Sequence, residues 1–184
     1  MPAEGGAILV LEDAAAAAAR GAPRIYGEIA GYATTFDPRP DGEHRSGLGR
    51  ALALALIDAD MDPAEIDVVF ADAAAVPELD RAEAEAIADV FDDRPVPVTA
   101  PKTMFGRMHA GAGALDVATA LLAIRDGVIP PTINIRHDEH YPIEIVLGEA
   151  RTAPVRAAVV LARGHGGFNS ALVVRAPSTV ATSS

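Results

Sequence analysis

Short apolar runs alternate along the chain with longer segments in which apolar residues recur every three or four positions. The short runs are rich in β-branched residues and are bounded by glycine, proline or acidic residues, which is typical of buried strands. On this basis we expect strands at residues 6–11, 25–36, 66–71, 96–99, 155–162 and 170–175.

The helical periodicity predicts three amphipathic helices. They span residues 46–59, 77–91 and 112–125. Ser46 is a suitable N-cap for the first, Pro77 fits the opening turn of the second, and Gly127 is a stop signal for the third. A run of six alanines at residues 14–19 predicts a further short helix that ends at Gly21.

Strands that alternate with helices and are followed by two consecutive strands predict an α/β layered fold, with a mixed sheet covered by helices on its faces. No linker marks a second domain, and 184 residues suffice for one hydrophobic core without a disulfide or a metal. We expect a loop at residues 37–42, a glycine-rich turn at residues 164–167 and a frayed tail at residues 178–184.

Composition excludes several classes of function. The chain contains no cysteine, so it has no thiol nucleophile, disulfide or thiolate metal site. Its 15 basic and 26 acidic residues give a formal net charge of −11, which would repel a nucleic-acid backbone. The apolar runs fall short of the about 18 residues of a membrane helix, and no basic segment opens a signal peptide. We therefore expect a soluble, cytoplasmic protein with no membrane or nucleic-acid partner.

Two motifs have the composition of ligand sites, but structural explanations are favoured. His137 and His140 flank two acids in a predicted loop, and without a third ligand at a defined spacing they are better explained as solvated loop residues than as a metal site. The glycine-rich residues 106–113 precede a helix and could hold an anion at its N-terminus. They lack the order of a phosphate or dinucleotide loop, so close packing is favoured. We expect no metal and no cofactor.

Serine and carboxylate chemistry is equally weakly supported. Ser46 and Ser170 are the only serines outside the tail, and neither lies in the Gly-x-Ser-x-Gly turn of a serine hydrolase. Asp80 and Glu83 lie one turn apart on a predicted helix and could act as paired carboxylates. On pattern alone, a solvated helix face is the more frequent explanation.

Several segments resemble ketosynthases and follow one another in the order of that family. They are residues 4–12, 27–33, 102–107 with 110–111, 130–134, and the glycine loop that begins Gly164, His165, Gly166, Gly167, Phe168. The resemblance implies the C-terminal half of a thiolase-like fold. Residues 1–22 would be the last strand and helix of the N-terminal half, residues 23–176 the C-terminal ketosynthase-like domain, and residues 177–184 a disordered tail.

Two departures from the ketosynthase pattern bear on function. Catalytic members carry one histidine in an Ala-His-Gly-Thr-Gly-Thr stretch and a second after Lys-Ser-x-x-Gly. This chain has Asp72, within the Ala-Asp-Ala-Ala-Ala-Val stretch of residues 71–76, and Arg107 at the matching places. In the family the histidines donate hydrogen bonds toward developing negative charge. Asp72 would repel that charge, and Arg107 is too basic to transfer a proton near neutrality, so the resemblance implies no catalytic residue here.

This combination resembles the chain-length factor, the ketosynthase beta subunit of bacterial type II aromatic polyketide synthases. The resemblance implies a non-catalytic subunit whose partners are a catalytic ketosynthase alpha subunit, its own missing N-terminal half and, indirectly, an acyl carrier protein. Two alternatives stay open: half of a malonyl-carrier-protein decarboxylase or β-ketoacyl synthase, and a nonfunctional remnant.

The resemblance also assigns a structural role to three charged residues. In the family, an acid on the helix after the first histidine motif lies beside the lysine of the second motif. The matching residues are Glu83 and Lys102, with Asp80 one helical turn earlier. We expect Glu83 and Lys102 to form a partly buried ion pair that is now architectural.

Overall fold

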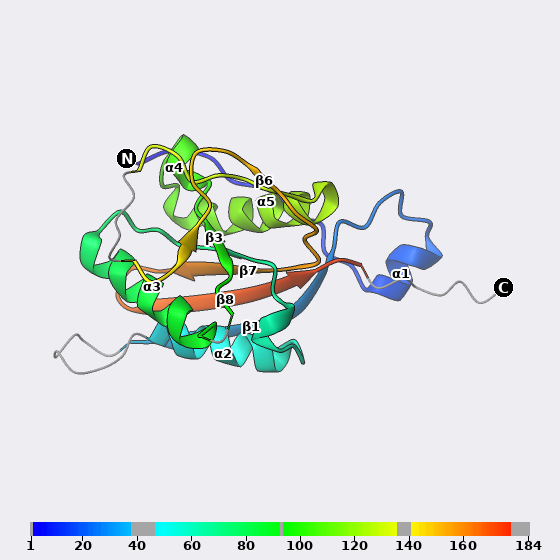
Figure 1. The fold of residues 1–184 in the computed structure, drawn as a ribbon. Helices are drawn as coiled ribbons and strands as arrows, with labels where there is room; N and C mark the ends of the chain where they lie inside the picture. Colours follow the sequence, from blue (N-terminus) through cyan, green and yellow to red (C-terminus); the bar gives the residue numbers. More distant parts are fainter. Residues whose placement is uncertain (1, 38–46, 93, 136–140, 178–184) are drawn as a thin grey trace.

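A six-stranded mixed sheet forms the centre of the molecule (Figure 1). The computed structural model describes residues 2–37, 47–92, 94–135 and 141–177. The strand order is β1-β8-β7-β2-β3-β5, in which β1, β8 and β7 are antiparallel neighbours and β2, β3 and β5 run parallel to β7. The strands are β1 (Glu28–Phe36), β2 (Val68–Phe70), β3 (Pro97–Thr99), β5 (Glu144–Ile145), β7 (Ala157–Arg163) and β8 (Phe168–Arg175).

Helices cover both faces of this sheet (Figure 1). Helices α2 (Gly47–Asp58) and α3 (Pro77–Val90) pack on one face and α5 (Ala112–Asp126) on the other. Strand β2 shows how the core is divided, because Val69 packs with α2 and α3 while Val68 and Phe70 pack with α5. A strand buried on both faces needs a continuous apolar run, which is the pattern that predicted it.

The remaining elements are short. They are the helices α1 (Ala14–Ala19) and α4 (Lys102–Phe105), the 3₁₀ turns η1 (Pro63–Glu65) and η2 (His109–Gly111), and a separate two-stranded sheet of β4 (Val128–Ile129) and β6 (Arg151–Thr152). None of the helices in the described ranges is both long enough and apolar enough to cross a membrane.

The predicted α/β fold with a mixed sheet between helices is confirmed, and most predicted elements lie within a few residues of their expected bounds. The helix at residues 14–19 matches the prediction, and α5 ends at Gly127, whose φ is 63°. The sequence did not reveal α4, β4, β5 or β6, because two to four residues carry no measurable periodicity. The Ser46 cap, the tail and nearly all of the predicted 37–42 loop lie outside the described residues.

The strand predicted at residues 6–11 is wrong. This segment has no strand neighbour in the described chain, and Ile8 and Val10 are 96% and 83% exposed. Only one residue of the run, Leu9, packs against the core. An apolar run indicates burial, but a strand also needs a neighbouring strand to pair its backbone groups.

Two glycines show where the elements approach most closely. A Cβ at Gly31 of β1 would lie 2.3 Å from the Ala55 carbonyl oxygen and 2.5 Å from the Ala59 nitrogen. A Cβ at Gly111 would lie 2.2 Å from the Gly5 carbonyl oxygen, which confirms close packing for part of the 106–113 motif. At Gly113 an added Cβ would meet no atom within 4 Å, so there the packing explanation fails.

We expect Gly31→Ala to destabilise the protein by about 2 kcal/mol, because backbone atoms of α2 cannot yield to a new methyl group. Gly113→Ala is the matched control. It lies in α5 with open space around it, and we expect it to be neutral or stabilising by up to about 1 kcal/mol. Thermal melting of the two variants tests the contrast, and equal melting temperatures would contradict the packing of β1 on α2.

Candidate functional site

Six charged side chains gather where the parallel strands β2 and β3 end. Asp72 follows β2, Asp80 and Glu83 lie on α3, Lys102 opens α4, Arg107 follows α4, and Asp116 lies on α5. We call these six residues the charge cluster. Because the carboxyl ends of adjacent parallel strands meet at one edge of a sheet, the segments that follow β2 and β3 are brought together there.

Asp72 and Arg107, the two residues at the expected histidine positions, contact each other. Arg107 Nη2 donates to Asp72 Oδ2 at 3.0 Å. The Asp72 side chain is 7% exposed and that of Arg107 25% exposed. The second amino nitrogen of Arg107, Nη1, is buried without a hydrogen-bond partner among the described residues. The structure therefore places an ion pair where two imidazoles were expected from the family pattern.

Lys102 is paired with Asp116. Its Nζ lies 2.7 Å from Asp116 Oδ2 and donates to the Ala71 carbonyl oxygen at 2.6 Å, and both side chains are almost fully buried. The predicted ion pair of Lys102 with Glu83 is wrong, because Glu83 uses its carboxylate for backbone amides. Asp116 was missed by the sequence analysis. The sequence pattern that could have revealed it is an acid in the middle of a largely apolar helix.

Glu83 binds the backbone of the segment that follows β2. Its Oε1 accepts from the Asp72 amide at 2.7 Å and its Oε2 from the Ala73 amide at 2.9 Å. Glu83 is 3% exposed, so the solvated-face explanation, favoured from pattern alone, is wrong for this residue. Asp80 is only half buried, and its Oδ1 has no hydrogen-bond partner among the described residues.

Burial is the main influence on the acids of the cluster. It raises the pKa of Glu83, and the neighbouring charge of Asp72 raises it further, while the amides of Ala73 and Asp72 and the charge of Lys102 lower it in part. Burial also raises the pKa of Asp116 more than Lys102 lowers it. The pKa of Asp80 is raised by burial and partly lowered by the amides of Ala74 and Ala75. These carboxyls are held in an environment that disfavours excess negative charge.

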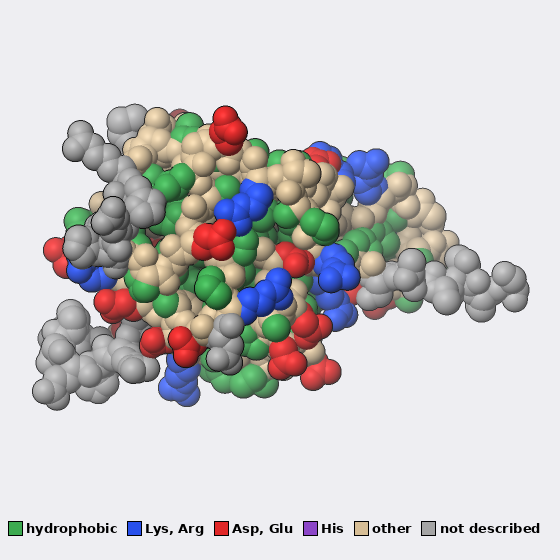
Figure 2. All heavy atoms as spheres, viewed as in Figure 1, with side chains coloured by type: hydrophobic (Ala, Val, Ile, Leu, Met, Phe, Trp, Pro, Cys, Tyr) green, Lys and Arg blue, Asp and Glu red, His purple; other side chains and the backbone are tan. Residues whose placement is uncertain are grey.

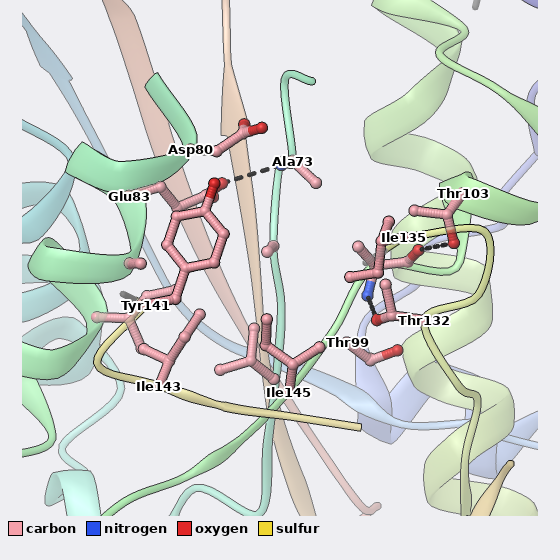
Figure 3. Close-up of a pocket in the computed structure, with 15 residues that line it drawn as sticks. Ala73, Asp80, Glu83, Thr99, Thr103, Thr132, Ile135, Tyr141, Ile143 and Ile145 are labelled. Atoms are coloured by element: carbon pink, nitrogen blue, oxygen red, sulfur yellow. Dashed lines mark hydrogen bonds between the residues drawn. The ribbon is translucent and has the colours of Figure 1, made fainter. Parts of the chain in front are cut away.

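A cavity of about 100 Å³ lies beside the cluster (Figure 3). Asp80 and Glu83 stand at one end and Thr103 and Thr132 at the other. The two threonine hydroxyls are engaged, since that of Thr103 donates to the Ala100 carbonyl and that of Thr132 accepts from the Ala100 amide. Most of the wall between is aliphatic: Ala84, Ile87, Val98, Ile143 and Ile145.

The predicted glycine loop forms the turn between β7 and β8. Gly166 and Gly167 have φ of 85° and 100°, which favours glycine. The turn is fixed to β1 because the Asp37 amide donates to the Gly167 carbonyl at 2.8 Å. Ser170 begins the next strand, where its hydroxyl donates weakly to the Ala162 carbonyl at 3.5 Å, as expected for a structural serine.

Metal binding finds no support in the described ranges, in which no three acids or histidines gather around a possible ion. The 137–140 motif lies outside those ranges. The cluster contains fixed charges in contact, and it holds neither an imidazole nor a thiol. It can position backbone and orient charge, but Arg107 cannot exchange a proton near neutrality.

Reversing the Asp72–Arg107 pair tests whether it contributes to stability. We expect Asp72→Arg and Arg107→Asp each to cost about 2 kcal/mol or more, because each places like charges in contact. The double variant should recover at least half of that loss. The exposed pair Arg151–Glu144 is the control, and its reversal should change the free energy of unfolding by less than about 1 kcal/mol. Additive losses in the double variant would show that the pair contributes nothing.

A second set of variants identifies the partner of Lys102. Lys102→Met leaves the Asp116 carboxylate buried without its cation, and we expect a loss of about 3 kcal/mol. Adding Asp116→Leu should restore much of the stability, whereas adding Glu83→Gln should not. All of these variants are compared by urea unfolding. Recovery of stability on adding Glu83→Gln instead would identify Glu83 as the partner of Lys102.

The family comparisons agree with this geometry. The model of the beta-ketoacyl synthase C-terminal domain matches residues 26–136, more than half of the chain. The ketoacyl synthase beta subunit of the tetracenomycin polyketide synthase from Streptomyces glaucescens is 57% identical over 95% of this chain and 43% of its own length. The actinorhodin polyketide beta-ketoacyl synthase 2 of Streptomyces coelicolor has the same identity and coverage.

Solved structures give the same result. The ishigamide ketosynthase/chain length factor superposes with a TM-score of 0.88 and 36% identity, over 97% of this chain and 44% of that one. A type II polyketide synthase ketosynthase, bound to a hexaketide and in complex with its acyl-carrier protein, has a TM-score of 0.81 and 28% identity over 90% of this chain and 42% of that one. The chain thus spans less than half the length of the relatives it matches. It has the thiolase-like ketosynthase fold and belongs to the beta-ketoacyl synthase family, in which it is similar to the beta subunits of type II polyketide synthases.

Proposed function

We propose that this chain is the C-terminal part of a non-catalytic ketosynthase beta subunit that partners a catalytic ketosynthase in aromatic polyketide biosynthesis. The observation that carries the proposal is the Asp72–Arg107 ion pair, at the two positions that the resemblance matches to the histidines of catalytic members. The same proposal implies the cytoplasm as its location and an acyl carrier protein as an indirect partner.

Condensation and decarboxylation both need groups that stabilise an oxyanion or enolate. Asp72 presents negative charge at this point, and the Arg107 amino group that approaches it is engaged in the ion pair. The chain also has no cysteine to carry an acyl group. This favours a subunit without condensing activity over the alternative of a malonyl-carrier-protein decarboxylase.

The apolar surface supports a partner over an isolated small protein. Gly31 of β1 faces α2, so Tyr32 and Phe36 point to the opposite face of the sheet. Phe36 and Phe168 stack edge to face with centroids 5.0 Å apart, and both rings are about 60% exposed. The extended segment at residues 6–11 also presents Ile8 and Val10 to solvent. We propose that the remainder of a beta subunit covers these surfaces, since the relatives are more than twice as long as this chain.

The acidic surface of the chain limits which other macromolecules it can bind. On the face that Figure 2 shows, arginines lie among more numerous acidic side chains and form no continuous basic patch. With a net charge of −11, the chain is unsuited to nucleic acid and would repel an acidic carrier protein. We therefore propose that a carrier protein docks through the catalytic partner.

Reconstitution tests the proposed function. The full chain, the N-terminal part of a related beta subunit and a catalytic ketosynthase are combined, and sedimentation is followed with and without each component. We expect the chain alone to self-associate or precipitate, because its apolar faces are uncovered, and to enter a defined complex with both partners. With radiolabelled malonyl-carrier protein, the chain alone should yield neither carbon dioxide nor acylated protein.

Three outcomes separate the alternatives. A cooperative monomer that ignores both partners would contradict the beta-subunit proposal and favour an independent small protein or a remnant. Carbon dioxide release by the chain with the N-terminal part, in the absence of the catalytic ketosynthase, would favour the decarboxylase. Complex formation without such release supports the proposal.

A further inference from the structure

The segment that carries Asp72 follows a backbone path unusual for its sequence. Ala73 and Ala75 have φ of 46° and 59°, while Ala74 between them does not have a positive φ. The left-handed region places the Cβ of an L-residue near the following carbonyl, which makes it unfavourable for alanine and natural for glycine. Such residues persist only where surrounding contacts hold them.

The contacts that hold this segment come from one face of α3. Glu83 accepts from the amides of Asp72 and Ala73 at 2.7 and 2.9 Å, and Figure 3 draws the second of these bonds. Asp80, one turn earlier, is not a second anchor of this kind, because its buried Oδ1 has no hydrogen-bond partner among the described residues. One carboxylate thus accepts from two successive backbone N–H groups.

The residue before this segment is held from the opposite side. The Ala71 carbonyl accepts from the buried ammonium of Lys102 at 2.6 Å, and the Ala71 amide donates to the Thr99 carbonyl at 2.9 Å. Glu83 therefore accepts from the amides of residues 72 and 73, and Lys102 donates to the carbonyl just before them. This explains how a run of alanines keeps a left-handed path.

We infer that Glu83 is a positioning residue, which holds the segment at residues 72–75 in this path and so keeps Asp72 against Arg107. The inference rests on the geometry of this chain and goes beyond the proposed function. It gives this buried acid a definite role: Glu83 stabilises a conformation that the side chains of Ala73 and Ala75 oppose.

Nuclear magnetic resonance tests the inference on the full chain, isotope-labelled and held in its complex with the N-terminal part of a related beta subunit and a catalytic ketosynthase, because the chain alone is expected to self-associate. A strong intraresidue Hα–HN Overhauser effect marks a positive φ, and we expect it at Ala73 and Ala75 but not at Ala74. Glu83→Gln replaces one acceptor oxygen with a donor NH₂, so it should abolish the effect at Ala73 and lower the melting temperature. Glu85→Gln, an exposed neighbour on the same helix, is the control and should change neither.

Glycine substitutions provide the rescue. Ala73→Gly and Ala75→Gly should each raise the melting temperature, by about 2 °C, because glycine adopts positive φ without the steric cost. Ala74→Gly should lower it, since there glycine adds only chain entropy to the unfolded state. Adding both favourable glycines to Glu83→Gln should recover most of its loss.

Two results would overturn the inference. One is a Glu83→Gln variant that retains the Overhauser effects of Ala73 and Ala75. The other is a loss of stability on glycine substitution at residues 73 and 75 equal to the loss at residue 74. The second comparison needs no change at Glu83, so it tests the left-handed path of residues 73 and 75 even where Glu83→Gln does not fold.

Discussion

The buried ammonium of Lys102 is the constraint on which this end of the molecule depends. An isolated charge in the interior is far costlier than a charge with a partner and satisfied hydrogen bonds. Asp116 on α5 and the Ala71 carbonyl at the end of β2 supply these. One side chain therefore joins α4 to the helix on one face of the sheet and to the end of a central strand, and the loop that carries Asp72 starts from that point.

Asp72 and Arg107, at the two positions matched to histidine, carry opposite charges that neutralise each other. Either Asp72 or Arg107 alone would leave a poorly solvated charge, but together they form a pair whose net charge is zero. Under the proposed function, the two positions that the family pattern assigns to histidine thus lie in contact while their chemistry differs. The scaffold that holds the pair consists of the loop after β2, the buried lysine and Glu83 on α3.

The sequence predicted what depends on local periodicity. Helices α2, α3 and α5 were predictable because their apolar residues recur at helical spacing, and β7 and β8 because they are continuous apolar runs. The segment at residues 6–11 was misjudged because its pattern does not reveal whether a neighbouring strand is present. Resemblance located Glu83 and Lys102, yet one sequence could not show which of several acids lies nearest the lysine. The left-handed alanines were hidden because alanine favours other conformations.

The pairing of the outermost strand has a consequence for the order of folding. Strand β1 lies at the edge of the sheet, and its only strand neighbour among the described residues is β8, with Phe36 opposite Phe168. Strand β8 also separates β1 from β7 and from the rest of the sheet. On a ribosome β1 therefore emerges well before the strand it pairs with, and α2 has no complete surface to pack on until β8 is made. Closing so long a loop is slow. The core on that face cannot form until β8 has been synthesised, and until then the alanine- and leucine-rich α2 is a segment for chaperones to shield.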